Sequence, residues 1–213
     1  MRPPLLRPRH CVLALLLFLP GCEGVGPYDV DATDQPGIVQ LEVNDPQGDL
    51  WPAPASAGLV LPDLVGLTAR RTEHGLEIGL EFAEPVSPEL TSPNAFGGFV
   101  DLDMDLDAST GGEGGVDIFR PLNSPATGLG VELIVNLDIG GGATLFDVMG
   151  DREAGSVDLQ FEGSRVTFVV PTSQIAPENR ELGLAALVGT RFDPTDRLPN
   201  AGHIRFFGPP ESR

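Results

Sequence analysis

The stretch Phe99-Val-Asp-Leu-Asp-Met-Asp-Leu-Asp-Ala-Ser-Thr-Gly111 contains four aspartates that alternate with apolar side chains before a Ser-Thr-Gly turn. Successive side chains of a β-strand point to opposite faces, so this spacing places the four carboxylates on one side for as long as the strand continues. Neighbouring carboxylates on that side would be about 7 Å apart and would repel one another by about 2.4 kcal/mol at an intermediate dielectric. A hard cation would remove this cost, so the stretch predicts a strand that ends in a calcium site.

Two other interpretations of the acidic stretch are open. It is also typical of a solvated edge strand, whose charges prevent pairing with another chain, and of a site for a different metal ion. The stretch is not an EF-hand, because Leu106 and Gly112 replace the glycine and the glutamate of that loop. Calcium takes about six to eight oxygen ligands, mainly carboxylates and carbonyls. The predicted carboxylate ligands are Asp101, Asp103, Asp105, Asp107 and Glu132.

From Asp63 onward, short apolar runs alternate with turns rich in Gly, Pro, Asn and Asp, without the period of an amphipathic helix. Gly75 and Gly163 indicate two tight hairpins, and only residues 173–178 are typical of a helical turn. About nine short strands predict an all-β fold, an antiparallel β-sandwich of jelly-roll or Ig-like type. The expected strands lie near residues 64–72, 76–83, 96–103, 131–138, 144–148, 156–162, 165–170, 182–188 and 203–207.

The expected core consists of aliphatic and Phe side chains. A weaker alternative is that Phe82, Phe99 and Phe168 form a ligand-stacking stripe. The single Trp and the single Tyr both precede residue 63, so the domain lacks the aromatic platform that sugar binding usually needs. The predicted core residues are Leu64, Leu67, Leu76, Ile78, Leu80, Phe82, Phe99, Leu133, Val135, Phe168, Val170, Leu184 and Leu187.

Residues 1–21 are predicted to be an export signal. Three arginines precede an apolar run at 12–19, which is shorter than the roughly 20 residues needed to cross a bilayer. The following Leu19-Pro-Gly-Cys22 resembles a bacterial lipobox, which implies acylation of Cys22; an ordinary cleaved signal is the alternative. Acylation also explains why the exported chain would keep one cysteine. We therefore expect a lipoprotein that is anchored in the bacterial cell envelope by acyl chains on Cys22, facing the periplasm or the surface.

Composition divides the rest of the chain into three parts. Residues 22–62, rich in Pro, Gly, Asp and Ala, indicate a flexible tether with a possible edge strand at 38–43. Residues 63–208 form the predicted sandwich domain, and 209–213 a C-terminal tail.

Charge and motifs exclude several function classes. The net charge of −18 becomes about −21 once the signal with its three arginines is removed, which argues against nucleic acid and anionic lipid as partners. There is no Gly-x-Ser-x-Gly elbow and no Walker loop. His74 and His203 are the only histidines after the signal. We therefore expect no enzymatic activity.

Four segments stand out in the sequence: Asp63-Leu-Val-Gly-Leu, Gly75-Leu-Glu-Ile-Gly-Leu-Glu-Phe, Val100 to Gly111, and Gly130-Val-Glu-Leu-Ile-Val135. Together they resemble bacterial surface modules related to the DOMON and family-nine carbohydrate-binding folds. The resemblance implies a β-sandwich over about residues 60–207. It also implies that Asp103, Asp105 and Asp107 form the acidic strand end, with Glu132 as the acidic position of the following strand. Leu133 stands where these modules often have an aromatic residue.

These observations predict a membrane-anchored lipoprotein that displays a calcium-stabilised β-sandwich with a binding or structural role. The alternative is a carbohydrate-binding module of a cell-envelope assembly; in either case the ligand would be a glycan or a protein. A concave face with exposed aromatic side chains would favour this alternative.

Overall fold

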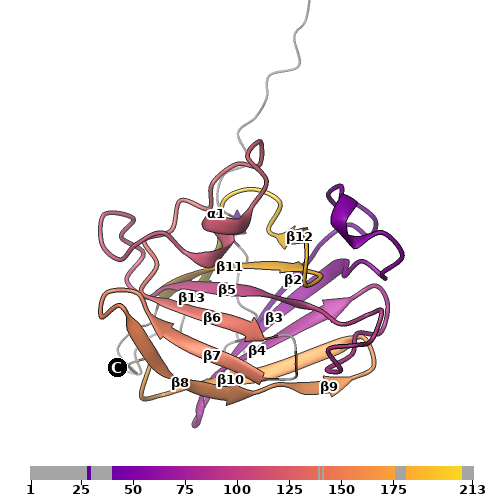
Figure 1. Ribbon diagram of the computed structural model, residues 1–213. Coiled ribbons are helices and arrows are strands. Elements are labelled where there is room, and N and C mark those ends of the chain that lie inside the picture. The colour runs from indigo at the N-terminus through magenta and orange to yellow at the C-terminus, as the bar shows by residue number, and fades with distance from the viewer. Residues whose placement is uncertain (1–27, 30–39, 139, 141, 176–180, 208–213) are drawn as a thin grey trace, which may run out of the picture.

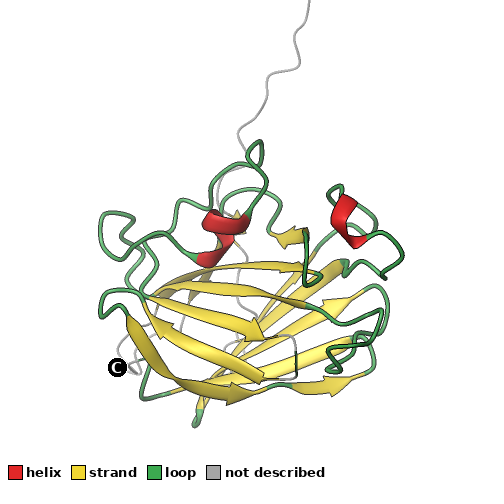
Figure 2. Ribbon diagram, viewed as in Figure 1, coloured by secondary structure: helices red, strands yellow, loops and turns green. Residues whose placement is uncertain are grey.

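The computed structural model describes residues 28–29, 40–138, 140, 142–175 and 181–207. The predicted signal at 1–21, Cys22 and the tail at 209–213 lie outside these residues. Within them the chain forms two β-sheets that pack face to face (Figures 1 and 2), and this confirms the predicted all-β sandwich. The helices in the described part of the chain lack the length and hydropathy to cross a membrane.

The larger sheet has eight strands in the order β1-β13-β11-β5-β6-β7-β8, with β12 also paired to β11. Its described pairings are antiparallel except that of β1 with β13. The strands are β1 Tyr28–Asp29, β5 Gly97–Asp103, β6 Leu133–Asp138, β7 Gly142–Asp147, β8 Arg152–Asp158, β11 Glu181–Gly189, β12 Pro194–Leu198 and β13 Ile204–Phe207.

The smaller sheet has five strands in the order β2-β3-β4-β10-β9. Both predicted hairpins are present: Thr72 pairs with Gly75, and Arg165 pairs with Glu162 across a turn in which Gly163 has a φ of 67°. The expected strand at 156–162 is instead two strands, because the chain passes from the larger sheet to the smaller one at Leu159. The strands are β2 Gln40–Asn44, β3 Leu64–Thr72, β4 Gly75–Phe82, β9 Gln160–Glu162 and β10 Arg165–Pro171.

The main core fills the space between the two sheets. Strand β10 illustrates how it forms, since every second side chain (Val166, Phe168 and Val170) is buried there. All predicted core residues belong to this core except Phe99 and Leu187. These two lie in a second apolar cluster beneath α1 (Gly115–Phe119), on the outer face of the larger sheet, so β5 and β11 are buried on both faces.

Residues 45–62 differ from the expected tether because they pack against the sandwich. The N–H of Trp51 donates to the carbonyl oxygen of Thr195 at 2.8 Å. Ser56, in the 3-10 turn η1 (Pro54–Ser56), is buried and its hydroxyl bonds to Thr190 and Asp193, at 2.6 Å each. Strand β2 is an edge strand of the smaller sheet, as the alternating pattern at 38–43 indicates. The folded unit therefore includes residues before 63.

Four short elements were not expected from the sequence, namely β1, η1, α1 and β12. The expected helical turn at 173–178 is only partly described. The N–H groups of Gln174 and Ile175 donate to the carbonyl oxygen of Pro171, which makes a turn. Residues 176–180 lie outside the described residues.

Candidate metal centre

Three of the five predicted ligands come together where β5 ends. Asp103, Asp105 and Glu132 each offer a carboxylate oxygen, and these oxygens lie within 4.8 Å of one another. Calcium–oxygen distances are about 2.3–2.6 Å, so two ligands on opposite sides of one ion are up to about 5 Å apart. The three oxygens therefore have a spacing that suits ligands of a single ion.

Backbone N–H groups orient the two less exposed carboxylates of this group. Asp103, the buried last residue of β5, accepts from the N–H of Leu106 at 2.6 Å and from the N–H of Gly130 at 3.1 Å, through its two oxygens. Glu132, just before β6, accepts from the N–H of Met104 at 2.7 Å. A carboxylate oxygen has more than one lone pair, so these bonds position both side chains and leave acceptor capacity for a cation.

Asp105 completes the group from the exposed side. Its Oδ1 accepts from the N–H of Asp107 at 2.9 Å and from the hydroxyl of Thr110 at 3.0 Å. The hydroxyl of Thr110 has one proton and several acceptors within reach, and Glu132 Oε1, at 3.2 Å, is another of these acceptors. Thr110 thus links the turn after β5 to the residue before β6.

The electrostatics of the group favour a cation. Burial raises the pKa of Glu132, and the charges of Asp103 and Asp105 raise it further. Among the ion pairs in the described part of the chain, none includes these three carboxylates. The negative charges are therefore close to one another without a neutralising side chain.

The turn that brings the carboxylates together contains a backbone outlier. Leu106 has a φ of 56°, a left-handed conformation that costs a residue other than glycine about 1–3 kcal/mol. Its N–H donates to Asp103 Oδ1. Counted from Asp101, this is the sixth position, where an EF-hand loop has glycine, so the chain makes a sharp turn here without that residue.

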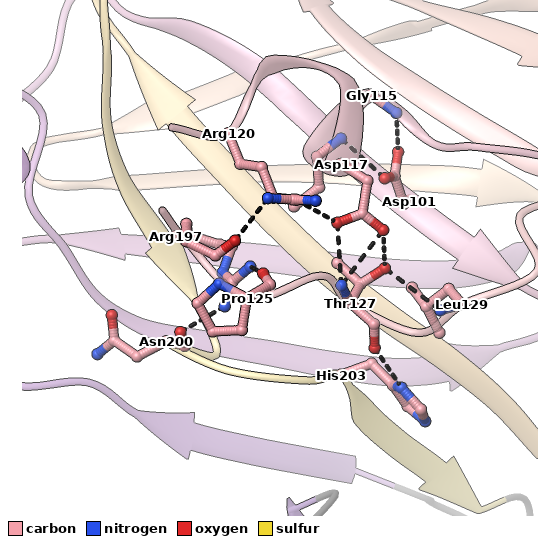
Figure 3. Close-up of polar contacts among 12 residues, drawn as sticks. Asp101, Gly115, Asp117, Arg120, Pro125, Thr127, Leu129, Arg197, Asn200 and His203 are labelled. Atoms are coloured by element: carbon pink, nitrogen blue, oxygen red, sulfur yellow. Dashed lines mark hydrogen bonds and ion pairs between the residues drawn. The ribbon is translucent and has the colours of Figure 1, made fainter. Parts of the chain in front are cut away.

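Asp101 has a different role from the predicted one. It is fully buried and accepts from the N–H groups of Gly115 at 2.9 Å and Val116 at 2.8 Å, at the start of α1 (Figure 3). Burial raises the pKa of its carboxyl to about 7, although the two backbone hydrogen bonds act in the opposite direction. A Cβ on Gly114 would overlap this carboxylate, so a glycine is needed there.

Asp107 also lies outside the group of three. It is exposed and accepts from the N–H and the hydroxyl of Ser109, at 2.9 and 2.6 Å, and these bonds lower its pKa. Its part in the structure is to shape the turn that follows Asp105.

A polar network that was not expected from the sequence holds the 104–132 loop, which joins β5 to β6 and contains α1 (Figure 3). Asp117 of α1 accepts from Thr127 and from Arg120, and the carbonyl oxygen of Thr127 lies 2.9 Å from His203 Nδ1. Arg197 of β12 is fully buried, and its guanidinium donates to three carbonyl oxygens, those of Pro125, Pro199 and Asn200. These contacts hold the loop that presents Gly130 to Asp103.

A cleft of about 350 Å³ lies on the outer face of the larger sheet. Phe119 stacks on Phe99 with ring centroids 4.8 Å apart, and Phe119 and Phe192 are each about half exposed at 53% and 54%. Polar side chains complete the lining, among them Asn136 and Arg191. The sequence did not reveal this arrangement, because Phe119 and Phe192 are 73 positions apart and both lie outside the apolar runs. In contrast, Phe82 and Phe168, two members of the possible stacking stripe, are in the core.

Comparisons of the chain with protein-family models, with curated proteins and with solved structures find no match. The resemblance to DOMON and family-nine carbohydrate-binding modules stays a prediction that rests on the quoted segments.

Proposed function

We propose that the chain is an exported lipoprotein, anchored in the bacterial cell envelope through acyl chains on Cys22, that displays a calcium-stabilised β-sandwich. It acts by binding or as a structural element, without catalysis. The observation that carries the calcium assignment is the close group of oxygens from Asp103, Asp105 and Glu132. The anchor rests on the sequence around Cys22.

The oxygen-only donor set fits a hard cation such as calcium better than zinc, which takes mainly His and Cys ligands in proteins. The three side chains belong to the end of β5, the turn after it and the approach to β6. A cation held by all three would tie both ends of the 104–132 loop together. It would also offset the repulsion that raises the pKa of Glu132.

Thermal unfolding of the full chain in millimolar calcium and in excess chelator tests this proposal. A site that binds only the folded state adds about 2.7 kcal/mol at 100 times its dissociation constant. For a chain of this size that corresponds to a rise of about 5–11 °C in the midpoint. The double variant Asp103→Asn, Asp105→Asn should lose this contribution, whereas the control Asp107→Asn should keep it.

Either of two results would refute the calcium assignment. The first is a midpoint that calcium leaves unchanged in the parent chain, which would favour a solvated acidic turn. The second is an equal rise in the parent and in the double variant, which would place the ion elsewhere.

The cleft with Phe119 and Phe192 supports a second candidate function, that of a carbohydrate-binding module. Exposed rings beside amide, carboxylate and guanidinium groups are suited to stack on sugar rings and to bond their hydroxyls. A glycan array probed with the full chain tests this candidate. Phe119→Ala and Phe192→Ala should each abolish binding, and Leu122→Ala, at a 99% exposed position outside the cleft, should not. Binding that both Phe variants retain would refute it.

A further inference from the structure

A second close group of carboxylates lies where the loop after β2 meets β12. Oxygens of Asp45, Asp49 and Asp196 lie within 4.8 Å of one another. Asp196 is opposite Val188 of β11, which is a core residue, so its side chain points toward the space between the sheets, and it is only 1% exposed. Its Oδ2 accepts from the N–H of Leu64 at 2.7 Å, so this carboxylate of the larger sheet contacts the smaller one.

A fourth carboxylate, Asp63, contacts the loop that carries Asp45 and Asp49. Its side chain is more than nine-tenths buried, with a relative exposure of 9%. One oxygen accepts from the N–H of Gly48, in the loop between Asp45 and Asp49, at 2.9 Å. The charge of Asp63 raises the pKa of both Asp45 and Asp196, although Asp63 lies outside the three carboxylates whose oxygens are within 4.8 Å of one another.

Two oxygens of this group are buried without any hydrogen-bond donor: Asp63 Oδ1 and Asp45 Oδ2. A buried carboxylate oxygen without a partner is costly, and proteins normally compensate such groups by pairing or by a metal ion. Carboxylates that merely cluster on a surface accept hydrogen bonds from water. These two oxygens are buried and lack that donor, so their lack of a partner is an observation independent of the clustering.

The cationic side chain nearest in sequence does not neutralise the group. Arg197 follows Asp196 directly, but its guanidinium donates to the three backbone carbonyls described above. The one side-chain donor to the group among the described hydrogen bonds is the neutral amide of Asn200, 3.0 Å from Asp45 Oδ1 and 2.7 Å from Asp49 Oδ2. Among the described ion pairs, none includes any of the four carboxylates.

We propose that Asp45, Asp49, Asp63 and Asp196 hold a second divalent cation, which clamps the two sheets together. The donors are all carboxylate oxygens on two loops and a strand, a set that fits the variable geometry of calcium better than the strict octahedron of magnesium. This inference goes beyond the proposed function, which requires only the group at Asp103.

The two groups are separate sites. Asp103 is opposite Gly183 of β11 and Asp196 is opposite Val188. Five residues of strand span about 17 Å. The two side chains also lie on opposite faces of the sheet, because positions 183 and 188 differ by an odd number. One ion cannot serve both groups, so the bound ions can be counted independently.

Calcium titration of the full chain by calorimetry tests the inference, with equilibrium dialysis to count the ions. The parent chain should bind two ions. Asp45→Asn, Asp49→Asn should bind one, and Asp103→Asn, Asp105→Asn should bind the other. Glu89→Gln, at an exposed position outside both groups, is the matched control and should bind two. The asparagine variants keep the shape of the side chains, and circular dichroism establishes that each is folded.

The outcomes separate this inference from the proposed function. A parent chain that binds one ion, lost only in Asp103→Asn, Asp105→Asn, overturns the second site and leaves the proposed function intact. One ion that is lost only in Asp45→Asn, Asp49→Asn supports the second site and refutes the first. If that double variant is unfolded, the single variant Asp63→Asn replaces it, and unchanged stoichiometry in this variant also overturns the inference.

Discussion

Asp101 offers the sharpest test of how the acidic strand is stabilised. The carboxylate accepts the N–H groups of Gly115 and Val116, each through a different oxygen, in a fully buried position. Asp101→Asn preserves the shape of the side chain but replaces one acceptor by an NH₂ group. One of the two backbone N–H groups then faces a donor, whereas Asp101→Ala leaves both without an acceptor.

The number of unpaired donors sets the expected magnitude. A buried N–H without a partner costs about 1–3 kcal/mol, so Asp101→Asn should lower the free energy of unfolding by about 1–3 kcal/mol and Asp101→Ala by about 2–6 kcal/mol. For a chain of this length, Asp101→Asn should lower the melting temperature by about 2–12 °C. The effect should depend on pH. Because burial raises the pKa of Asp101 to about 7, the native state binds a proton that the unfolded chain has lost between about pH 4 and pH 7.

The sign of this dependence follows from proton linkage. Where the native state binds more protons, stability falls as pH rises, so the contribution of Asp101 is present at low pH and is lost as pH rises through about 7. Asparagine does not titrate, so the destabilisation by Asp101→Asn should be larger at pH 5 than at pH 8. Urea unfolding of the full chain in chelator at both pH values measures this, with the exposed Glu113→Gln as control. A variant as stable as the parent at pH 5 would refute the reasoning.

Three further predictions concern a loop, a buried cation and the anchor. Gly130→Ala should weaken calcium binding and lower the melting temperature, because its Cβ would overlap the carbonyl oxygens of Asp107 and Thr110; calorimetry measures both, and unchanged values would contradict the described loop. Arg197→Lys should destabilise the chain by about 2–4 kcal/mol in urea unfolding, since one ammonium cannot reach all three carbonyls of the guanidinium fork. Cys22→Ser should move the expressed protein from the membrane fraction to the soluble fraction and abolish labelling with radioactive palmitate; a variant that stays labelled would exclude Cys22 as the acylated residue.

Most of the fold was predictable because period-two alternation and turn residues are local signals. In β10, Val166, Phe168 and Val170 recur at every second position, and the polar Arg165 and Thr167 lie between the first of them, which indicates both the strand and its buried face. Gly75 and Gly163 mark the hairpins for the same local reason. The elements that were missed lack such a signal. Strand β12 has the sequence Pro-Thr-Asp-Arg-Leu, and its polar side chains are buried because distant backbone groups bond to them.

The candidate site was predictable only in part because alternation along a strand does not decide which partner each carboxylate meets. Asp101 and Asp103 share one face of β5, as the spacing requires, but the start of α1 bonds to the first and the N–H of Gly130 bonds to the second. Beyond Asp103 the strand ends, so Asp105 and Asp107 follow the geometry of a turn and not that of a strand. Residues 45–62 were assigned to a tether for a similar reason: the contacts that hold Ser56 come from Thr190 and Asp193, more than 130 positions later.

The position of β11 has a consequence for the kinetics of the native state. The strand is bonded to β5 along one edge, and β13 and β12 divide the other edge between them. Its amides should therefore exchange with deuterium only when the whole domain unfolds, long after those of the largely exposed β8. Because Asp103 and Asp196 lie across from its two halves, cations at the two carboxylate groups would slow the same amides. The deuterium exchange rates of the β11 amides would then report whether cations occupy each of the two carboxylate groups.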